Sequence, residues 1–197
     1  MNCSGVSSKT YFQADHYGLT IAASQGVTVT GGNYVAKNHG ITIGGSDNDG
    51  NIVNRRILVQ NTTSGVSEGS SNSSLNSHGN AEYVTFRDNV CTGVAMGGSN
   101  QMAINNDCTT GNVTCSEVTS FNFSIIGNRC VALGWLMSAF VDTSAWTPNT
   151  SKDTLIIDGN DLTYRIGSSI RVNAEDYPNC KNAVIRVTNN VLNGPLF

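Results

Sequence analysis

Among the residues of this chain, His78 is the leading candidate for acid–base chemistry. It lies in the polar stretch SSLNSHGNAEYVTFRDN, residues 73–89. An imidazole changes charge near neutral pH, so it can accept and return a proton under working conditions. Carboxylates are the second candidates, because a pair with one member kept protonated can divide the roles of acid and base. The carboxylate candidates, each in a polar segment, are Asp47, Asp49, Glu68 and Asp107.

The composition predicts a single all-β domain. The chain has 197 residues, enough for one well-buried core. Only 13% of them are charged, and the polar remainder is rich in Asn, Ser, Thr and Gly, which favours strands joined by turns over long helices. The net charge of −3 argues against a nucleic-acid partner. No stretch approaches the roughly 20 apolar residues of a membrane helix, so no membrane insertion is expected.

Six cysteines are too few for a stapled miniprotein in a chain of this length. Cys108 and Cys115 flank TTGNVT and could close a loop, whereas Cys91 and Cys130 fall at one repeated apolar position. No pair has zinc-site spacing. We therefore expect mostly free thiols, with Cys91 and Cys130 as small core residues.

A repeated pattern of apolar residues and asparagine organises the chain. With Φ for an apolar residue, Φ-x-Φ-x-x-N-x-Φ matches VTFRDNVC (84–91), FSIIGNRC (123–130), LIIDGNDL (155–162) and IRVTNNVL (185–192), and more loosely VTVTGGNY (27–34) and ILVQNTTS (57–64). A second strand precedes each copy: GLTI (18–21), GITI (40–43), SLNS (74–77), GVAM (93–96), GWLM (134–137) and SIRV (169–172). Each unit therefore predicts strand, variable loop, strand, asparagine turn and short strand, with the longest insertion following Gly97.

Units this small cannot bury an apolar face alone, so they must stack. Stacking pairs each strand in parallel with its equivalent, at ~4.8 Å per coil. Asparagine suits the tight corner because it tolerates left-handed backbone, and a column of asparagines can bond from coil to coil. An antiparallel sandwich is the competing fold, but it would not explain the asparagine column.

These repeats resemble the pectin-lyase-like superfamily of right-handed parallel β-helices, and among them bacteriophage tailspikes and related polysaccharide-degrading enzymes. The resemblance covers residues 18 to 192 and implies three strands per turn in about six coils, with an asparagine ladder after the second strand. We expect a lead-in over residues 1–17 and a β-helix domain over 18–197, as a segment of a longer chain. Tailspike relatives associate as trimers, so a homotrimer is expected, on a virion tail or outside the cell.

Alignment of the strands that open each coil predicts that His78 projects outward. The outward residues are Thr20, Thr42, Asn76, Ala95, Leu136 and Arg171, and the next ones are Ala22, Gly44, His78, Gly97, Ser138 and Asn173. Two neighbouring glycines would leave the imidazole accessible in a shallow trough. The family's catalytic histidine segments carry acidic neighbours that this strand lacks. A solitary histidine is more often structural, and we interpret His16 and His39 as loop residues.

The loops beside this column predict a glycan-binding surface, with turn residues as the plainer interpretation. Amides, cations and aromatic rings suit sugar hydroxyls, carboxylates and ring faces. The binding candidates are Asn76, Arg55, Arg171, Trp146 and Tyr177.

Three kinds of chemistry remain open. Hydrolysis would pair Asp47 or Asp49 with Asp107 or Glu68, at ~5 to 9.5 Å between carboxyl groups. Elimination from a uronic acid would use His78 as base, with Arg171 or Arg55 neutralising the sugar carboxylate.

The third is no reaction, in a receptor-binding adhesin or a structural section of a spike. Binding and cleavage of a bacterial surface polysaccharide is the leading expectation. No cofactor is expected, although Asp47 and Asp49 in SDNDGN could form a weak calcium site that departs from EF-hand spacing.

Overall fold

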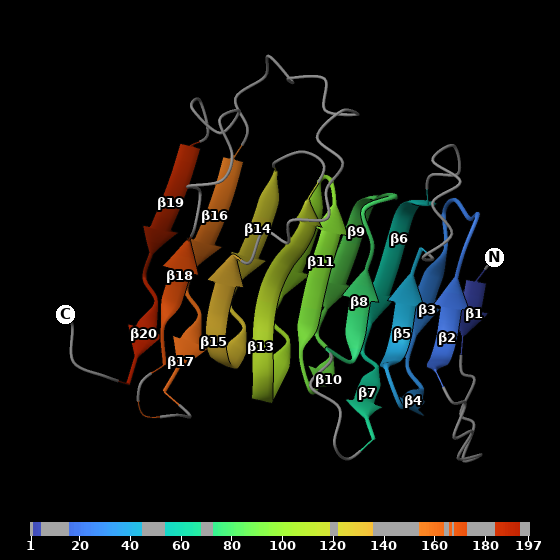
Figure 1. Cartoon of the computed structure of the whole chain (residues 1–197), viewed down its shortest axis with the longest axis horizontal. Coiled ribbons are helices and arrows are strands. Elements are labelled where there is room, and N and C mark those ends of the chain that lie inside the picture. The colour runs from blue at the N-terminus through green and yellow to red at the C-terminus, as the bar shows by residue number, and fades with distance from the viewer. Residues whose placement is uncertain are drawn as a thin grey trace.

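The computed structural model describes residues 2–4, 16–44, 54–67, 73–118, 122–135, 154–163, 166, 168–172 and 184–193. Every regular element in these ranges is a strand, and paired strands run parallel throughout. The strands wind into a solenoid with the N-terminus at one end and the C-terminus at the other (Figure 1). The predicted parallel β-helix is therefore confirmed, and the antiparallel sandwich is wrong. No helix among the described residues is long and apolar enough to span a membrane.

One sheet, the central column, holds the second strand of each coil. Its order is β1 (Asn2–Ser4), β3 (Thr28–Thr30), β6 (Asn54–Gln60), β9 (Ala81–Arg87), β12 (Gln101–Ile104), β14 (Phe123–Ile126), β16 (Thr154–Asp158) and β19 (Val184–Thr188). Inward residues alternate with outward ones, and side chains such as Val84 and Phe86 are fully buried. β1 falls within the segment predicted as a lead-in.

The other sheet contains two columns of strands. The opening column comprises β2 (Tyr17–Ile21), β5 (His39–Ile43), β8 (Leu75–Ser77), β11 (Val94–Gly98), the later parts of β13 (Asp107–Val118) and β15 (Arg129–Trp135), and β18 (Ile170–Val172). The closing column comprises β4 (Asn33–Ala36), β7 (Thr63–Val66), β10 (Val90–Cys91), the first parts of β13 and β15, β17 (Asp161–Leu162) and β20 (Val191–Leu192). β13 and β15 thus run through both columns without a break.

The segment after Gly97 is a complete coil and not the predicted insertion. β12 pairs with β9 on one side and β14 on the other, and Val113 to Cys115 pairs with β11. The 39-residue interval from Val84 to Phe123 divides at Gln101 into 17 and 22 residues. The opening column therefore has seven members among the described strands, where the repeats predicted about six coils.

The extra coil escaped the repeat pattern because Gln101 occupies an apolar position. Gln101 is 0% exposed. Its Oε1 accepts a 2.6 Å hydrogen bond from Ser77 Oγ, and its Nε2 donates to the Ala81 and Gly97 carbonyl oxygens. Burial of an amide costs little when its hydrogen bonds are satisfied, so a core position can hold it.

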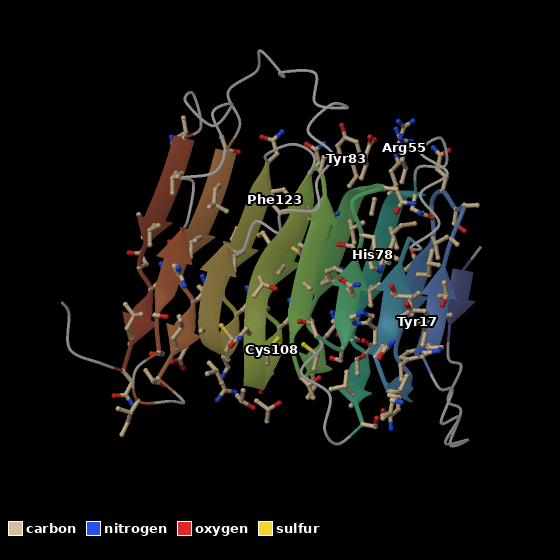
Figure 2. The ribbon with its side chains drawn as sticks, in the orientation of Figure 1. Tyr17, Arg55, His78, Tyr83, Cys108 and Phe123 are labelled. Carbon is tan, nitrogen blue, oxygen red and sulfur yellow. The ribbon has the colours of Figure 1, made fainter. Side chains whose placement is uncertain are left out.

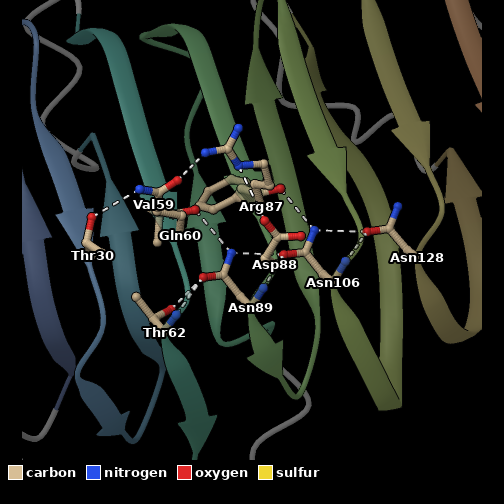
Figure 3. A network of polar contacts seen from close by, with 10 residues as sticks. Thr30, Val59, Gln60, Thr62, Arg87, Asp88, Asn89, Asn106 and Asn128 are labelled. Carbon is tan, nitrogen blue, oxygen red and sulfur yellow. Dashed lines mark hydrogen bonds and ion pairs between the residues drawn. The ribbon is translucent and has the colours of Figure 1, made fainter.

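An asparagine ladder joins the corners between the central and closing columns (Figure 3). Each side-chain Nδ2 donates to Oδ1 of the next asparagine at 2.8–3.0 Å, through Asn89, Asn106, Asn128, Asn160 and Asn190. Thr62 takes the ladder position one coil before Asn89, and its Oγ1 donates to Asn89 Oδ1 at 2.8 Å. The four asparagines that the strict repeat predicted all belong to this ladder.

The described cysteines are buried free thiols, as the sequence predicts. Cys91, Cys108 and Cys130 stack in the closing column, with 2.8 Å between the Sγ atoms of Cys91 and Cys108. Burial raises the pKa of the Cys130 thiol to about 12. Cys115 lies in the opening column, so the loop closure by Cys108 and Cys115 is wrong.

Candidate functional site

The outer face of the first three coils carries the candidate site, which we define as Tyr17, His39, Asn76 and His78. Thr20, Thr42 and Asn76 are in register on β2, β5 and β8. His78 lies two residues after Asn76, just past the end of β8. A Cβ built on Gly44 would lie 3.2 Å from the Cβ of His78. Gly44 therefore lies beside the Cβ of His78, with the Asn80 side chain filling the space next to it, and His78 is half-buried.

One amide joins the two imidazoles. Asn76 Nδ2 donates to His78 Nε2 at 3.0 Å and lies 3.4 Å from His39 Nε2. Both Nε2 atoms therefore act as acceptors, which puts the ring protons on Nδ1. His39 Nδ1 donates in turn to the Ser73 carbonyl oxygen at 2.6 Å. That short bond to the backbone fixes the tautomer of His39 and leaves its Nε2 lone pair directed at Asn76.

The rings form a continuous row across the coils. Tyr17 stacks on His39, with ring centroids 5.8 Å apart and planes 4° apart. His39 meets His78 edge to face at 6.3 Å. Figure 2 shows Tyr17 and His78 on the same side of the molecule, at different heights along the opening column.

The structure corrects the interpretation of His39 as a loop residue, because it begins β5 and belongs to the site. His16 precedes β2, where its backbone oxygen accepts from Asn38 N and its ring Nδ1 lies 3.3 Å from Asn38 Nδ2. The signal for the site was in the sequence: YGLTI and HGITI align residue by residue, which puts Tyr17 beside His39.

A buried hydroxyl lies beside the amide. Thr42 is 1% exposed and its Oγ1 has no hydrogen-bond partner among the described residues. Its strand neighbour in register is Asn76. A buried polar atom left without a partner costs about 1–3 kcal/mol. Thr42 therefore adds a hydroxyl to the polar groups gathered here.

Arg55 lies near the site but already has a partner. Its Nε donates to Glu82 Oε2 at 2.8 Å, between β6 and β9. Glu82 follows the tight turn in which Ala81 N donates to the His78 carbonyl oxygen. The pair is largely exposed and contributes little to stability. It does, however, place opposite charges at the corner next to His78.

Two predicted residues lie away from His78. Arg171 is in register with Gly134, Thr114, Ala95 and Asn76 in turn, which separates it from Asn76 by four strands, or about 19 Å at ~4.8 Å each. On β15 the residue in this outward register is thus Gly134, where the alignment had predicted Leu136.

Asp107 begins β13, in its closing-column part, in register with Val90 and Arg129. Its Oδ2 pairs with Arg129 Nη1 at 3.3 Å. The following residue, Cys108, is near the lower end of the strands in Figure 2, far from His78.

The remaining candidates, Asp47, Asp49, Glu68, Trp146 and Tyr177, lie outside the described residues, and so does the predicted calcium site. Among the residues that are described, no three His, Cys, Asp or Glu side chains form a group that could hold a metal ion.

Comparison with known proteins gives a family and two structural relatives. The family described as Gp49, pectin lyase-like, matches residues 1–191. No curated protein matches the sequence. The fold is similar to the Gp54 tailspike of Acinetobacter baumannii bacteriophage AP22, solved in complex with A. baumannii capsular saccharide, at 13% identity and a TM-score of 0.59 over 98% of this chain and 38% of that one. It is also similar to the tailspike gp61 of Pseudomonas phage phi297, at 19% identity and a TM-score of 0.60 over 92% of this chain and 30% of that one. The chain spans about a third of the length of these tailspikes.

Proposed function

Because the chain belongs to the Gp49 pectin lyase-like family, we propose that it binds a bacterial surface polysaccharide along the opening column and cleaves it beside His78. The fold supports the proposal, since a tailspike with this fold was solved with a capsular saccharide bound. A location on a virion tail and assembly as a homotrimer belong to the same proposal. Light scattering on the purified protein tests the trimer directly.

The observation that carries the proposal is the joining of His39 and His78 through Asn76. Two imidazoles, each with Nε2 as an acceptor, lie on one outward face beside the Thr42 hydroxyl. Imidazoles exchange protons near neutral pH, and cleavage of a glycosidic bond requires a proton at the leaving oxygen. A positioned acid or base contributes typically 10²–10⁴-fold to the rate.

The surroundings assign different roles to the two rings. His39 is held between Tyr17 and the Ser73 carbonyl oxygen, which favours one fixed orientation. His78 follows the end of β8, and its Cβ lies beside Gly44. We assign proton transfer with the substrate to His78. His39 and Asn76 position its ring, with the Asn76 amide giving way to a substrate group at His78 Nε2.

The test compares three histidine variants on a panel of purified capsular polysaccharides. His78→Ala should lower turnover at least 100-fold. His39→Ala should lower it less, because that ring acts through Asn76. His16→Ala is the matched control and should cleave at the normal rate. New reducing ends without ultraviolet absorbance indicate hydrolysis, and both signals together indicate elimination with an unsaturated uronate product. Full turnover by His78→Ala would refute the assignment.

A second function, binding without cleavage, is favoured by one observation. Asn76 Nδ2 occupies the lone pairs of both Nε2 atoms, which a general base would need to have free. A receptor-binding surface would use the same row of rings with no reaction. Retention of polysaccharide by the protein in affinity electrophoresis, with no product over long incubation, would establish this function and exclude the first.

A further inference from the structure

Two neighbouring residues, Arg56 and Tyr83, have left-handed backbone at a corner where the other positive-φ residues are Gly or Asn. Their φ angles are 57° and 56°. They lie in register on adjacent coils, since Arg55 pairs with Glu82 and Ile57 pairs with Val84. Each is the third residue of its strand, β6 or β9, at the corner where the chain enters the central column.

The same corner recurs along the solenoid with positive φ, which we define as the corner column: Gly26, Arg56, Tyr83, Asn100 and Asn122. The corner before the asparagine ladder shows what this backbone ordinarily takes. There the positive-φ residues are Gly31, Asn61, Asp88, Asn105, Gly127, Gly159 and Asn189. Gly, Asn and Asp enter the left-handed region readily, whereas a long or aromatic side chain is strained there. Arg56 and Tyr83 are thus the exceptions in both corners.

Among the described residues, no side-chain hydrogen bond or ion pair of Arg56 or Tyr83 compensates for the strain. Tyr83 is 55% exposed and Arg56 is exposed too. Within the described part of the chain no carboxylate pairs with Arg56. By contrast, Asn122 Nδ2 donates to Asn100 Oδ1 at 3.0 Å further along the corner column, so asparagine there supports the fold. Strained residues that add nothing to packing concentrate at binding and catalytic sites.

Among the described residues, the net charge at this corner is positive. Arg55 and Glu82, which precede Arg56 and Tyr83, neutralise each other in their 2.8 Å ion pair. Arg56 therefore contributes the net charge at this corner, next to an exposed ring. Figure 2 shows Tyr83 and Arg55 at the same rim of the molecule, with His78 below them.

We propose that Arg56 and Tyr83 form a subsite for an acidic sugar residue of the polysaccharide. The phenol ring of Tyr83 offers a flat face with negative charge density, on which the C–H bonds of a pyranose ring can lie. The guanidinium of Arg56 binds the sugar carboxylate through two parallel hydrogen bonds. The subsite rests on the proposed function, because it places the bound chain at the corner beside His78, and it names the substrate class as an acidic polysaccharide.

The experiment measures stability and binding on the same variants. Tyr83→Asn and Arg56→Asn relieve the backbone strain, so each should raise Tm by about 2–4 °C. Each should also weaken binding to an acidic polysaccharide at least tenfold. The probes are polygalacturonate, alginate and hyaluronan, each compared with its carboxyl-reduced form by affinity electrophoresis. Wild-type protein should prefer the acidic form, and Arg56→Asn should abolish that preference. Arg87→Asn, at an exposed arginine of β9 with ordinary backbone, is the matched control and should preserve it.

The outcomes separate this subsite from the proposed function. Binding only to neutral capsular polysaccharides would overturn the acidic subsite and leave polysaccharide binding intact. Failure to bind any of the acidic probes, or unchanged preference in Arg56→Asn, would also overturn it. A lower Tm in both asparagine variants would show that the two side chains serve the fold and would remove the premise. Loss of cleavage in His78→Ala bears only on the proposed function.

Discussion

Replacement of the buried ladder residue Asn106 by alanine should destabilise the protein strongly. Asn106 is 1% exposed, and its side chain makes four hydrogen bonds. Its Oδ1 accepts from the backbone and side-chain nitrogens of Asn89, and its Nδ2 donates to Phe86 O and Asn128 Oδ1. At ~1 kcal/mol per bond, with buried partners left unsatisfied, we expect a loss of about 3–5 kcal/mol.

Asn190 is the control, because its side chain also makes four hydrogen bonds. It accepts from both nitrogens of Asn160 and donates to the Ile157 and Thr188 carbonyl oxygens. It is only partly buried, so water can replace the lost partners, and Asn190→Ala should cost about 1 kcal/mol. Urea unfolding measures both differences. Equal losses for the two variants, or less than about 1 kcal/mol for Asn106→Ala, would refute the argument that buried corner-to-corner bonding holds the coils together.

Three further predictions concern the core. In the folded state the pKa of the Cys130 thiol is raised to about 12, above ~8.5 in the unfolded chain. The contribution of this thiol to stability is therefore complete below pH ~8.5 and is lost as the pH rises towards 12. Cys130→Ala should flatten the fall in Tm measured across that range, and an unchanged slope would contradict this. Gln101→Ala should cost about 2–4 kcal/mol in urea unfolding, because the Ser77 hydroxyl and the Ala81 carbonyl lose a buried partner; a neutral result would mean that the core refills the space. Gly111→Ala would place a Cβ 1.5 Å from the Thr92 carbonyl oxygen, so we expect the variant to lose its cooperative unfolding transition, and a wild-type melting curve would contradict that close approach.

The sequence predicts the fold well where the ladder is chemically obligatory. Asn89, Asn128, Asn160 and Asn190 stand at a fixed distance from two inward residues, because their side-chain amides bond from coil to coil just after each corner. The coil at Gln101 was missed because hydrogen bonds to Ser77 and Ala81 make a polar residue acceptable in the core. A search for apolar residues cannot detect a core position that holds a polar side chain whose hydrogen bonds are all satisfied.

The register of the sixth opening strand shows a second limit. The stretch LGWLM offers two alternating frames, and the structure buries Leu133, which pairs with Val113 and Ile170. Neighbouring strands decide between the frames, and they are remote in sequence. The candidate site shows the same limit: His78 was identified by type, but His39 joins it through one amide on a third position, Asn76. Geometry of that kind depends on how the coils align with one another, and in the sequence the only sign of that alignment was the match between YGLTI and HGITI.

The unbroken strand β13 has a mechanical consequence. Most coils in a solenoid touch only their neighbours, so a pulling force should strip them off one after another from either end. β13 belongs to two successive coils at once, pairing with β10 and β11 on one side and with β15 on the other. Detaching it means tearing both coils together. Under force, the coils at the two ends should therefore unfold one at a time, whereas the two coils that share β13 should unfold together in one larger step.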